Sequence, residues 1–296
     1  MSKSAVVPSM VTASEDIPSQ PSFRTKRPLV NDSQDSLTVI DLREIWTYRE
    51  LFYFLTLRDI KVRYKQAAMG AAWAIIQPFA IMFIFTVFFG FFMRLPTNGM
   101  PHALFFYSGL APWMFFSAAV GAGSVSLINN SNLVTKVYFP RIIVPAAAVG
   151  GLLVDLLITC ALLIGLALYY GVSWTWEIVA LPGLILLLMW LALDFSIWLA
   201  ALTVKYRDIR HALPFVLQLW MFLTPIMYPL SVVPGKWHWV MYLNPLTGVV
   251  EGLRSSITGQ SFNWRAIAAS LVIALAMLLI SLQAFRRIEQ SFADLI

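Results

Sequence analysis

Residues 57–78 read LRDIKVRYKQAAMGAAWAIIQP, and the stretch changes from a charged, amphipathic pattern to an apolar one without an intervening linker. In a helix, Tyr53, Leu57, Ile60 and Tyr64 fall three or four residues apart and form one apolar stripe. This pattern predicts an amphipathic helix that lies in the membrane interface and leads directly into a membrane-spanning helix.

Cations line the face beside this stripe. Arg58, Lys61 and Lys65 would lie among anionic lipid head groups, which attract basic side chains near a membrane surface. Asp59 and Arg63 are four residues apart, the spacing of a favourable ion pair on a helix. Charge alone leaves open whether this helix only anchors the chain or also contacts a partner.

Composition defines the protein class. Hydrophobic residues make up 59% of the 296 residues, charged residues 12%, and the mean hydropathy is +0.74, which indicates a polytopic membrane protein. The single cysteine, Cys160, cannot form an intrachain disulfide, and the three histidines lack metal-ligand spacing, so no metal site is expected. The net charge of +6 follows the distribution that membrane topology requires, and no nucleic-acid partner is expected.

The chain divides into a polar start and an apolar remainder. Residues 1–41 are rich in Ser and Pro, and we expect a disordered cytoplasmic tail there. Residues 42–296 are expected to form one all-α transmembrane domain, with the interface helix at about 46–66 and a short cytoplasmic carboxyl terminus. Six apolar runs have the roughly 20 residues that a membrane core requires: 70–93, 103–128, 142–170, 178–204, 212–228 and 267–285.

The distribution of Lys and Arg predicts the orientation. Most of them precede the first run or fall in alternate connections, as at Lys136, Lys205 and Arg286, while few fall in the other connections, as at Arg94. Because cytoplasmic loops carry an excess of these cations, the sequence predicts that both termini are cytoplasmic.

Two connections on the predicted cytoplasmic side have distinctive patterns. NNSNLVTKVYFPR, residues 129–141, combines cations, aromatic residues and a proline, which suits a short helix presented to a partner but also an ordinary solvated loop. KYRDIRHA, residues 205–212, is a charged hairpin in which Arg207 and Asp208 either contact a partner or pin two helix ends.

The connection between the fifth and sixth runs is too long and apolar for a plain external loop. Within residues 229–265 the sequence predicts short re-entrant helices, and Asn244-Pro245 breaks the backbone where a re-entrant turn needs it. Trp237, Trp239 and Tyr242 suit an aromatic belt at the interface or a gate whose rings stack on sugars. Glu251 and Arg254, three residues apart, are expected to form a local ion pair.

Polar and small residues also occur inside the spans. Asp155 and Asp194 lie deep in the third and fourth runs, where an acid serves either function or a hydrogen-bonded structural role. The run AAAVGG at residues 146–151 predicts close helix packing, and Gln77-Pro78 predicts a kink in the first span.

Some motifs are absent from the sequence. It has no glycine-rich phosphate loop ending in Gly-Lys-Ser/Thr, no HExxH motif and no GxSxG elbow. We therefore expect neither enzyme activity nor ATP hydrolysis in this chain alone.

Four ordered stretches carry a family resemblance: RDIKVRYKQAAMGAAWAIIQP, LVTKVYFPR, YRDIRHALPFVLQLWMFLTPIMYP and LNPLTGVVEGLR. From about Leu42 to the carboxyl end, the chain resembles the permease subunit of type 2 ATP-binding cassette exporters. Among these it is similar to the branch that exports O-antigen, capsular and teichoic-acid polysaccharides.

The resemblance implies a function and partners. A homodimer of this subunit, bound to two copies of a separate cytoplasmic ATPase that holds ATP and Mg, would move a lipid-linked polysaccharide across the bacterial inner membrane. This chain itself would carry no cofactor. Spans one and five would line the conduit and its lateral opening to membrane lipids.

The resemblance also assigns residues to roles. The residues implied to couple the chain to the ATPase are Arg58, Asp59, Lys61, Arg63, Tyr64, Lys65, Lys136, Tyr138, Phe139, Arg141, Tyr206, Arg207 and Asp208. Those implied to form the channel exit or outer gate are Trp237, Trp239, Tyr242, Asn244 and Pro245.

Other functions remain open at this stage. The same architecture serves export of a small hydrophobic compound or lipid. An ion-coupled carrier would use Asp155 and Asp194, and its transport would follow the proton gradient rather than ATP. A membrane-embedded glycosyltransferase would need catalytic residues that the sequence does not display.

Overall fold

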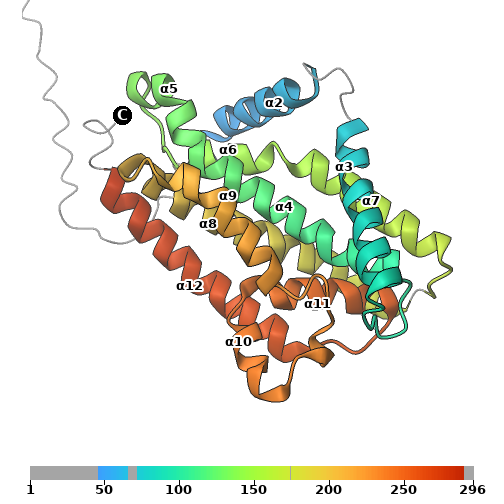
Figure 1. Ribbon diagram of the computed structural model, residues 1–296. Coiled ribbons are helices and arrows are strands. Elements are labelled where there is room, and N and C mark those ends of the chain that lie inside the picture. Colours follow the sequence, from blue (N-terminus) through green and yellow to red (C-terminus); the bar gives the residue numbers. More distant parts are fainter. Residues whose placement is uncertain (1–45, 66–71, 174, 290–296) are drawn as a thin grey trace, which may run out of the picture. The chain divides into compact units, whose positions relative to one another are not determined.

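The computed structural model describes residues 46–65, 72–173 and 175–289. The predicted tail at residues 1–41 lies outside these ranges. The described residues contain helices and no strand, which confirms the all-α prediction (Figure 1). The helices are α2 (Arg49–Lys65), α3 (Ala72–Phe85), α4 (His102–Asn129), α5 (Ser131–Lys136), α6 (Ile143–Gly150), α7 (Leu153–Tyr169), α8 (Leu181–Lys205), α9 (Ile209–Leu223), α10 (His238–Tyr242), α11 (Pro245–Thr258) and α12 (Trp264–Glu289).

Shorter or wider turns complete the fold. A π-helix, η1 (Thr86–Phe92), continues α3, and a 3-10 turn, η2 (Trp176–Ala180), precedes α8. Two further 3-10 turns, η3 (Leu230–Val232) and η4 (Gly235–Trp237), lie in the connection between α9 and α10.

Five helical segments of the described chain are long and apolar enough to cross a membrane: Ala72–Phe92, His102–Asn129, Ile143–Tyr169, Trp176–Lys205 and Trp264–Ile288. The predicted fifth span, residues 212–228, corresponds to α9, which has 15 residues and ends at Leu223. At 1.5 Å per residue such a helix is about 22 Å long, shorter than the roughly 30 Å membrane core. The chain is therefore a multi-pass membrane protein, and the number of six spans stays a prediction.

The helix α4 forms the centre of the fold. Most of its length is buried, and it packs against α8, α6, α11, α3 and α7. Aromatic rings fill the space beside it: the Trp220 ring of α9 lies 5.3 Å from Phe116 of α4 and 5.2 Å from Phe195 of α8, between ring centroids. These edge-to-face contacts hold the short helix α9 against two long ones.

A second hydrophobic cluster lies at one end of the bundle. Figure 1 places α5 and the carboxyl end of α12 at this end and α10 at the other. We call it the basal cluster; its buried members are Leu55, Leu127, Val134, Phe139, Ile143, Val144, Ala147, Ile197, Ala200, Ala201, Val204 and Phe285. Because it draws on α2, α4, α5, α6, α8 and α12, it holds α2 and the short helix α5 in one packed unit.

The third predicted span is not one regular helix. It divides at Gly151 into α6 and α7. A Cβ atom on Gly150 would lie 3.0 Å from the Thr56 hydroxyl of α2, and one on Gly151 would lie 3.1 Å from the Asp59 Cβ. The small-residue run at 146–151 therefore permits close packing, as predicted, and its partner is α2.

The first span departs from α geometry later than Pro78. Helical hydrogen bonding continues past this proline, and the chain changes to the π-helix η1 at Thr86. Gly90 of η1 is buried against His102, whose ring carbons would lie 2.9 Å from an added Cβ. Gly90 therefore lets the π-helix η1, whose turns are wider than those of an α-helix, approach the first residue of α4 closely.

Candidate transport site

The helix α2 rests on α6. Its apolar side chains do not gather on one face as the predicted stripe requires, and its buried face differs from that stripe. Leu55 is buried and Leu51 packs against the basal cluster, whereas Tyr53 of the predicted stripe is 58% exposed. Thr56 and Asp59 fit against the glycine pair of the third span. Arg58, Lys61, Lys65 and Val62 are exposed, as a contact surface requires.

The end of α2 carries charged contacts that differ from the predicted ion pair. Arg63 does not pair with Asp59; its Nη1 lies 2.8 Å from Asp155 Oδ2. Asp59 pairs with the adjacent Arg58 at 2.8 Å. The Tyr64 hydroxyl also donates a hydrogen bond to Asp155. Arg63 and Asp155 are 92 positions apart in the sequence, and helical spacing cannot reveal a contact at that separation. The predicted pair of Asp59 with Arg63 was wrong for this reason.

The two aspartates thus occupy unlike surroundings, although the sequence placed them at similar depth. Asp155 lies in the first turn of α7, where a carboxylate is favoured by the helix dipole, and a quarter of its side chain is exposed. Asp194 of α8 is completely buried, and neither carboxylate oxygen has a hydrogen-bond partner.

The Arg63, Tyr64 and Asp155 group forms the polar end of a cavity. The cavity has a volume of about 650 Å³ and lies among α2, α3, α4, α7 and α9. Its other polar lining groups are Gln77, Ser117 and Thr159, and its aromatic ones are Trp73, Phe85, Trp113 and Phe115. A chamber with aromatic walls and a polar end can hold an amphipathic molecule or the faces and hydroxyls of sugars.

The short helix predicted within residues 129–141 is α5, and the chain directly after it is not helical. The α-helix covers only six residues, Ser131–Lys136, and the chain is extended at Val137. Tyr138 is 84% exposed, whereas Phe139 is 4% exposed and belongs to the basal cluster. Phe139 was assigned to the coupling surface; its side chain is buried and packs this loop against the fold, so the coupling role implied for it stays a prediction.

The hairpin between α8 and α9 is exposed as predicted. Tyr206, Arg207 and Asp208 all lie at the surface, and the Lys205 ammonium lies 5.2 Å from the Tyr206 ring centroid. Backbone hydrogen bonds from His211 and Ala212 to the Asp208 carbonyl begin α9. The hairpin therefore fits both alternatives. It ends α8 and begins α9, as a helix-pinning role requires, and it remains accessible to a partner.

The residues assigned to an outer gate separate into two groups. Trp237 and Trp239 are 51% and 62% exposed and provide accessible rings at the α10 end. Asn244 caps α11 and joins it to α9, since its side chain accepts from Trp220 Nε1 at 3.1 Å and donates to Thr224 Oγ1 at 2.9 Å. Tyr242 is half-buried and Pro245 is buried, so both are less accessible than the two tryptophans.

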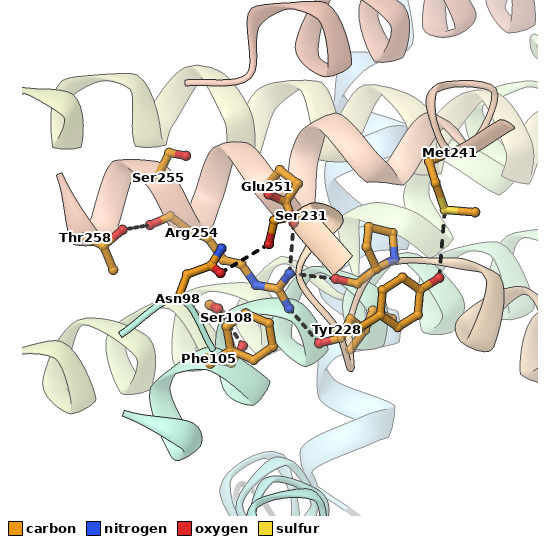
Figure 2. A network of polar contacts seen from close by, with 12 residues as sticks. Asn98, Phe105, Ser108, Tyr228, Ser231, Met241, Glu251, Arg254, Ser255 and Thr258 are labelled. Atoms are coloured by element: carbon orange, nitrogen blue, oxygen red, sulfur yellow. Dashed lines mark hydrogen bonds and ion pairs between the residues drawn. The ribbon is translucent and has the colours of Figure 1, made fainter. Parts of the chain in front are cut away.

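Sequence reasoning missed the role of Arg254. The predicted pair with Glu251 is present at 3.1 Å, but the guanidinium also donates to the carbonyl oxygens of Pro225 and Ile226, each at 2.6 Å. Figure 2 shows it beside the Phe105 ring, whose centroid lies 3.9 Å from the guanidinium carbon. Arg254 is 4% exposed and joins α11, α4 and the chain after α9. The spacing of three residues between Arg254 and Glu251 predicted the ion pair, but nothing in the sequence predicted the contacts with Pro225, Ile226 and Phe105.

Comparison with known proteins identifies the family. The sequence profile described as ABC-2 type transporter matches residues 50–258. The chain is 31% identical over 216 residues to the O-antigen export system permease protein RfbA of Myxococcus xanthus, covering 72% of this chain and 82% of that protein. It is 26% identical over 252 residues to the Klebsiella pneumoniae protein of the same name, covering 83% and 95%. The polysialic acid transport protein KpsM of Escherichia coli is 25% identical over 234 residues, covering 75% and 90%.

Proposed function

The chain belongs to the ABC-2 type transporter family, and we propose that it is the membrane-spanning subunit of an exporter of a lipid-linked, O-antigen-like polysaccharide. The similarity to O-antigen export permeases over most of the chain carries this proposal. The chain is a transport subunit rather than an enzyme, and an ABC ATPase is its partner. In the finer proposal, two copies of the chain pair with two ATPase subunits, which hold ATP and Mg, in a bacterial inner membrane with both termini cytoplasmic.

The cavity supports the polysaccharide reading. Its aromatic walls and its polar groups supply the two kinds of contact that a sugar chain on a lipid carrier needs. Its lining includes several residues of α3, which corresponds to span one, and Met221 of α9, which corresponds to span five. This fits a conduit to which both segments contribute in two copies of the chain.

The basal end supports contact with an ATPase. Lys136, Tyr138, Tyr206 and Arg207 are all exposed on the connections at the predicted cytoplasmic side. Packing in the basal cluster connects their supporting segments to α2. A protein docked there would act on α2 and α5 through one packed unit.

We expect Tyr138→Ala to weaken the ATPase contact. The side chain is 84% exposed, so its removal costs little folding stability but removes the largest exposed ring of the loop. The amount of ATPase retained with an affinity-tagged chain should fall several-fold. Tyr169→Ala is the matched control, because Tyr169 is 82% exposed at the far end of α7 and should leave retention unchanged. Equal retention in both variants would contradict the contact.

We also expect the double variant Trp237→Ala, Trp239→Ala to fold normally and to lower surface polysaccharide several-fold. Both rings are more than half exposed. Without them, the stacking of a flat indole ring on the apolar face of a sugar is lost. Trp264→Ala provides the control, since Trp264 is 67% exposed at the start of α12. Normal surface polysaccharide in the double variant would favour an aromatic belt over a gate.

Purification of the complex tests the partner assignment. A tagged chain extracted from its host membrane should retain an ABC ATPase, and the mass of the complex should correspond to two copies of each subunit. Added ATP should be hydrolysed by the complex and not by this chain alone. Retention of no ATPase would contradict the proposal, and sensitivity of transport to the proton gradient but not to ATP would favour an ion-coupled carrier.

A further inference from the structure

The helix α2 is attached to the third span at two successive places. At the first, Thr56 and Asp59 of α2 lie against Gly150 and Gly151, where added Cβ atoms would lie 3.0 and 3.1 Å from them. This contact falls on the junction between α6 and α7. It is a steric contact, so it holds the two segments close together without fixing either in the direction of its axis.

The second attachment is polar and lies one helical turn further along. Arg63 and Tyr64, at the end of α2, both bond to the carboxylate of Asp155, in the first turn of α7. Burial and the neighbouring Asp155 carboxylate raise the pKa of Tyr64 above its ordinary value, so its hydroxyl remains a hydrogen-bond donor. A carboxylate with two donors on one helix resists both sliding and rotation of that helix.

The same three side chains line the cavity. Arg63, Tyr64 and Asp155 form its polar group, and Gln77 of α3 and Thr159 of α7 also line it. A displacement of α2 that carries Asp155 with it therefore moves α7 and changes the wall of the cavity. If the bonds to Asp155 are lost, the polar attachment of α2 to α7 is lost and only the steric contact at the α6–α7 junction remains between α2 and the third span.

We propose that Asp155 is the positioning residue through which movement of α2 is passed to the third span and to the cavity wall. This inference rests on the proposed function, because it takes the ATPase to be the source of the movement. Asp155 acts through Arg63 and Tyr64 and needs no contact with ATP or with the polysaccharide. The expected consequence of its loss is ATP hydrolysis without a matching amount of export.

The test compares export with ATP hydrolysis for each variant. Genes for the variants are returned to a deletion strain, in which the surface polysaccharide of the host is measured on whole cells. The permease–ATPase complex of each variant is purified into nanodiscs, and its ATP hydrolysis is measured. Asp155→Asn and Arg63→Gln should each lower surface polysaccharide at least tenfold and keep ATP hydrolysis within twofold of wild type.

A reciprocal exchange separates coupling from simple anchoring. The double variant Arg63→Asp, Asp155→Arg restores opposite charges between the two helices, and it should recover at least a third of wild-type surface polysaccharide. Glu50→Gln is the control on α2: Glu50 is exposed in the first turn of this helix, and its variant should export normally. Elution profiles of all variants confirm that each complex is assembled.

Two results would overturn the inference. Normal surface polysaccharide in Asp155→Asn and Arg63→Gln would show that these bonds transmit nothing. Loss of ATP hydrolysis in parallel with export would show a structural role. Failure of the wild-type gene to restore surface polysaccharide would instead reject the proposed function together with the inference, so the two failures are distinguishable.

Discussion

Arg254→Ala is expected to remove most of the folded protein from the membrane. The guanidinium has two short bonds to backbone carbonyl oxygens, one bond to Glu251 and a ring contact with Phe105. Truncation leaves those carbonyl groups and the Glu251 carboxylate without their donor in a buried site. Removing one partner of a buried ion pair costs about 3–5 kcal/mol, a large share of the stability of a typical domain.

The measurement is the amount of monodisperse protein recovered in detergent and the temperature at which it is lost. Arg265→Ala is the matched control, because Arg265 is exposed near the start of α12 and should behave as wild type. Arg254→Lys should be intermediate, since an ammonium group lacks the fork that reaches two carbonyl groups at once. Recovery of Arg254→Ala at the wild-type level and melting temperature would show that the contacts contribute little.

Gly248→Ala has the second largest expected effect, because α11 and α12 meet closely at this residue. A Cβ on Gly248 would lie 2.3 Å from the Ala266 carbonyl oxygen and 2.5 Å from Ser270 Oγ. The Gly248 amide also donates to Ser270 Oγ at 3.1 Å, and separation of the helices would break this bond. Overpacking costs typically about 1–3 kcal/mol, and a backbone carbonyl cannot move aside as a flexible side chain does.

The same thermal measurement checks this substitution. We expect a lower melting temperature and a smaller monodisperse fraction for Gly248→Ala. Gly121→Ala is the control with the opposite sign: nothing lies within 4 Å of its added Cβ in α4, and alanine is a better helix former by about 1 kcal/mol. A melting temperature for Gly248→Ala at or above that of wild type would contradict the close contact.

Local patterns in the sequence were enough to predict most helices. Apolar runs of sufficient length predicted the long segments. The change from a charged to an apolar pattern near residue 70 predicted the division between α2 and α3. The extent of α9 was overestimated because residues 224–228 continue the apolar pattern. Their chain leaves the helix at Thr224, where the Pro225 and Ile226 carbonyl groups bond to Arg254. This contact is tertiary, and hydropathy cannot report it.

The site was predictable in outline but not in its connections. Exposure of Arg58, Tyr138 and Trp237 agrees with the surface roles implied for them. The burial of Phe139 and Pro245 and the bonds of Asn244 were not predicted, because aromatic residues and backbone breaks look alike in sequence whether they face outward or pack inside the fold. The bonds of Asp155 to α2 depend on packing of the glycine pair against Thr56 and Asp59, which no local spacing specifies.

The most direct test of the central claim is to delete the gene in its host and locate the lipid-linked polysaccharide. If the chain belongs to an exporter of this glycan, the polymer should accumulate on the cytoplasmic side of the inner membrane while surface polysaccharide is lost. The gene supplied on a plasmid should restore the surface polymer, and a variant ATPase that cannot hydrolyse ATP should reproduce the deletion. Normal surface polysaccharide in the deletion strain would contradict the account and favour export of a small hydrophobic compound or lipid.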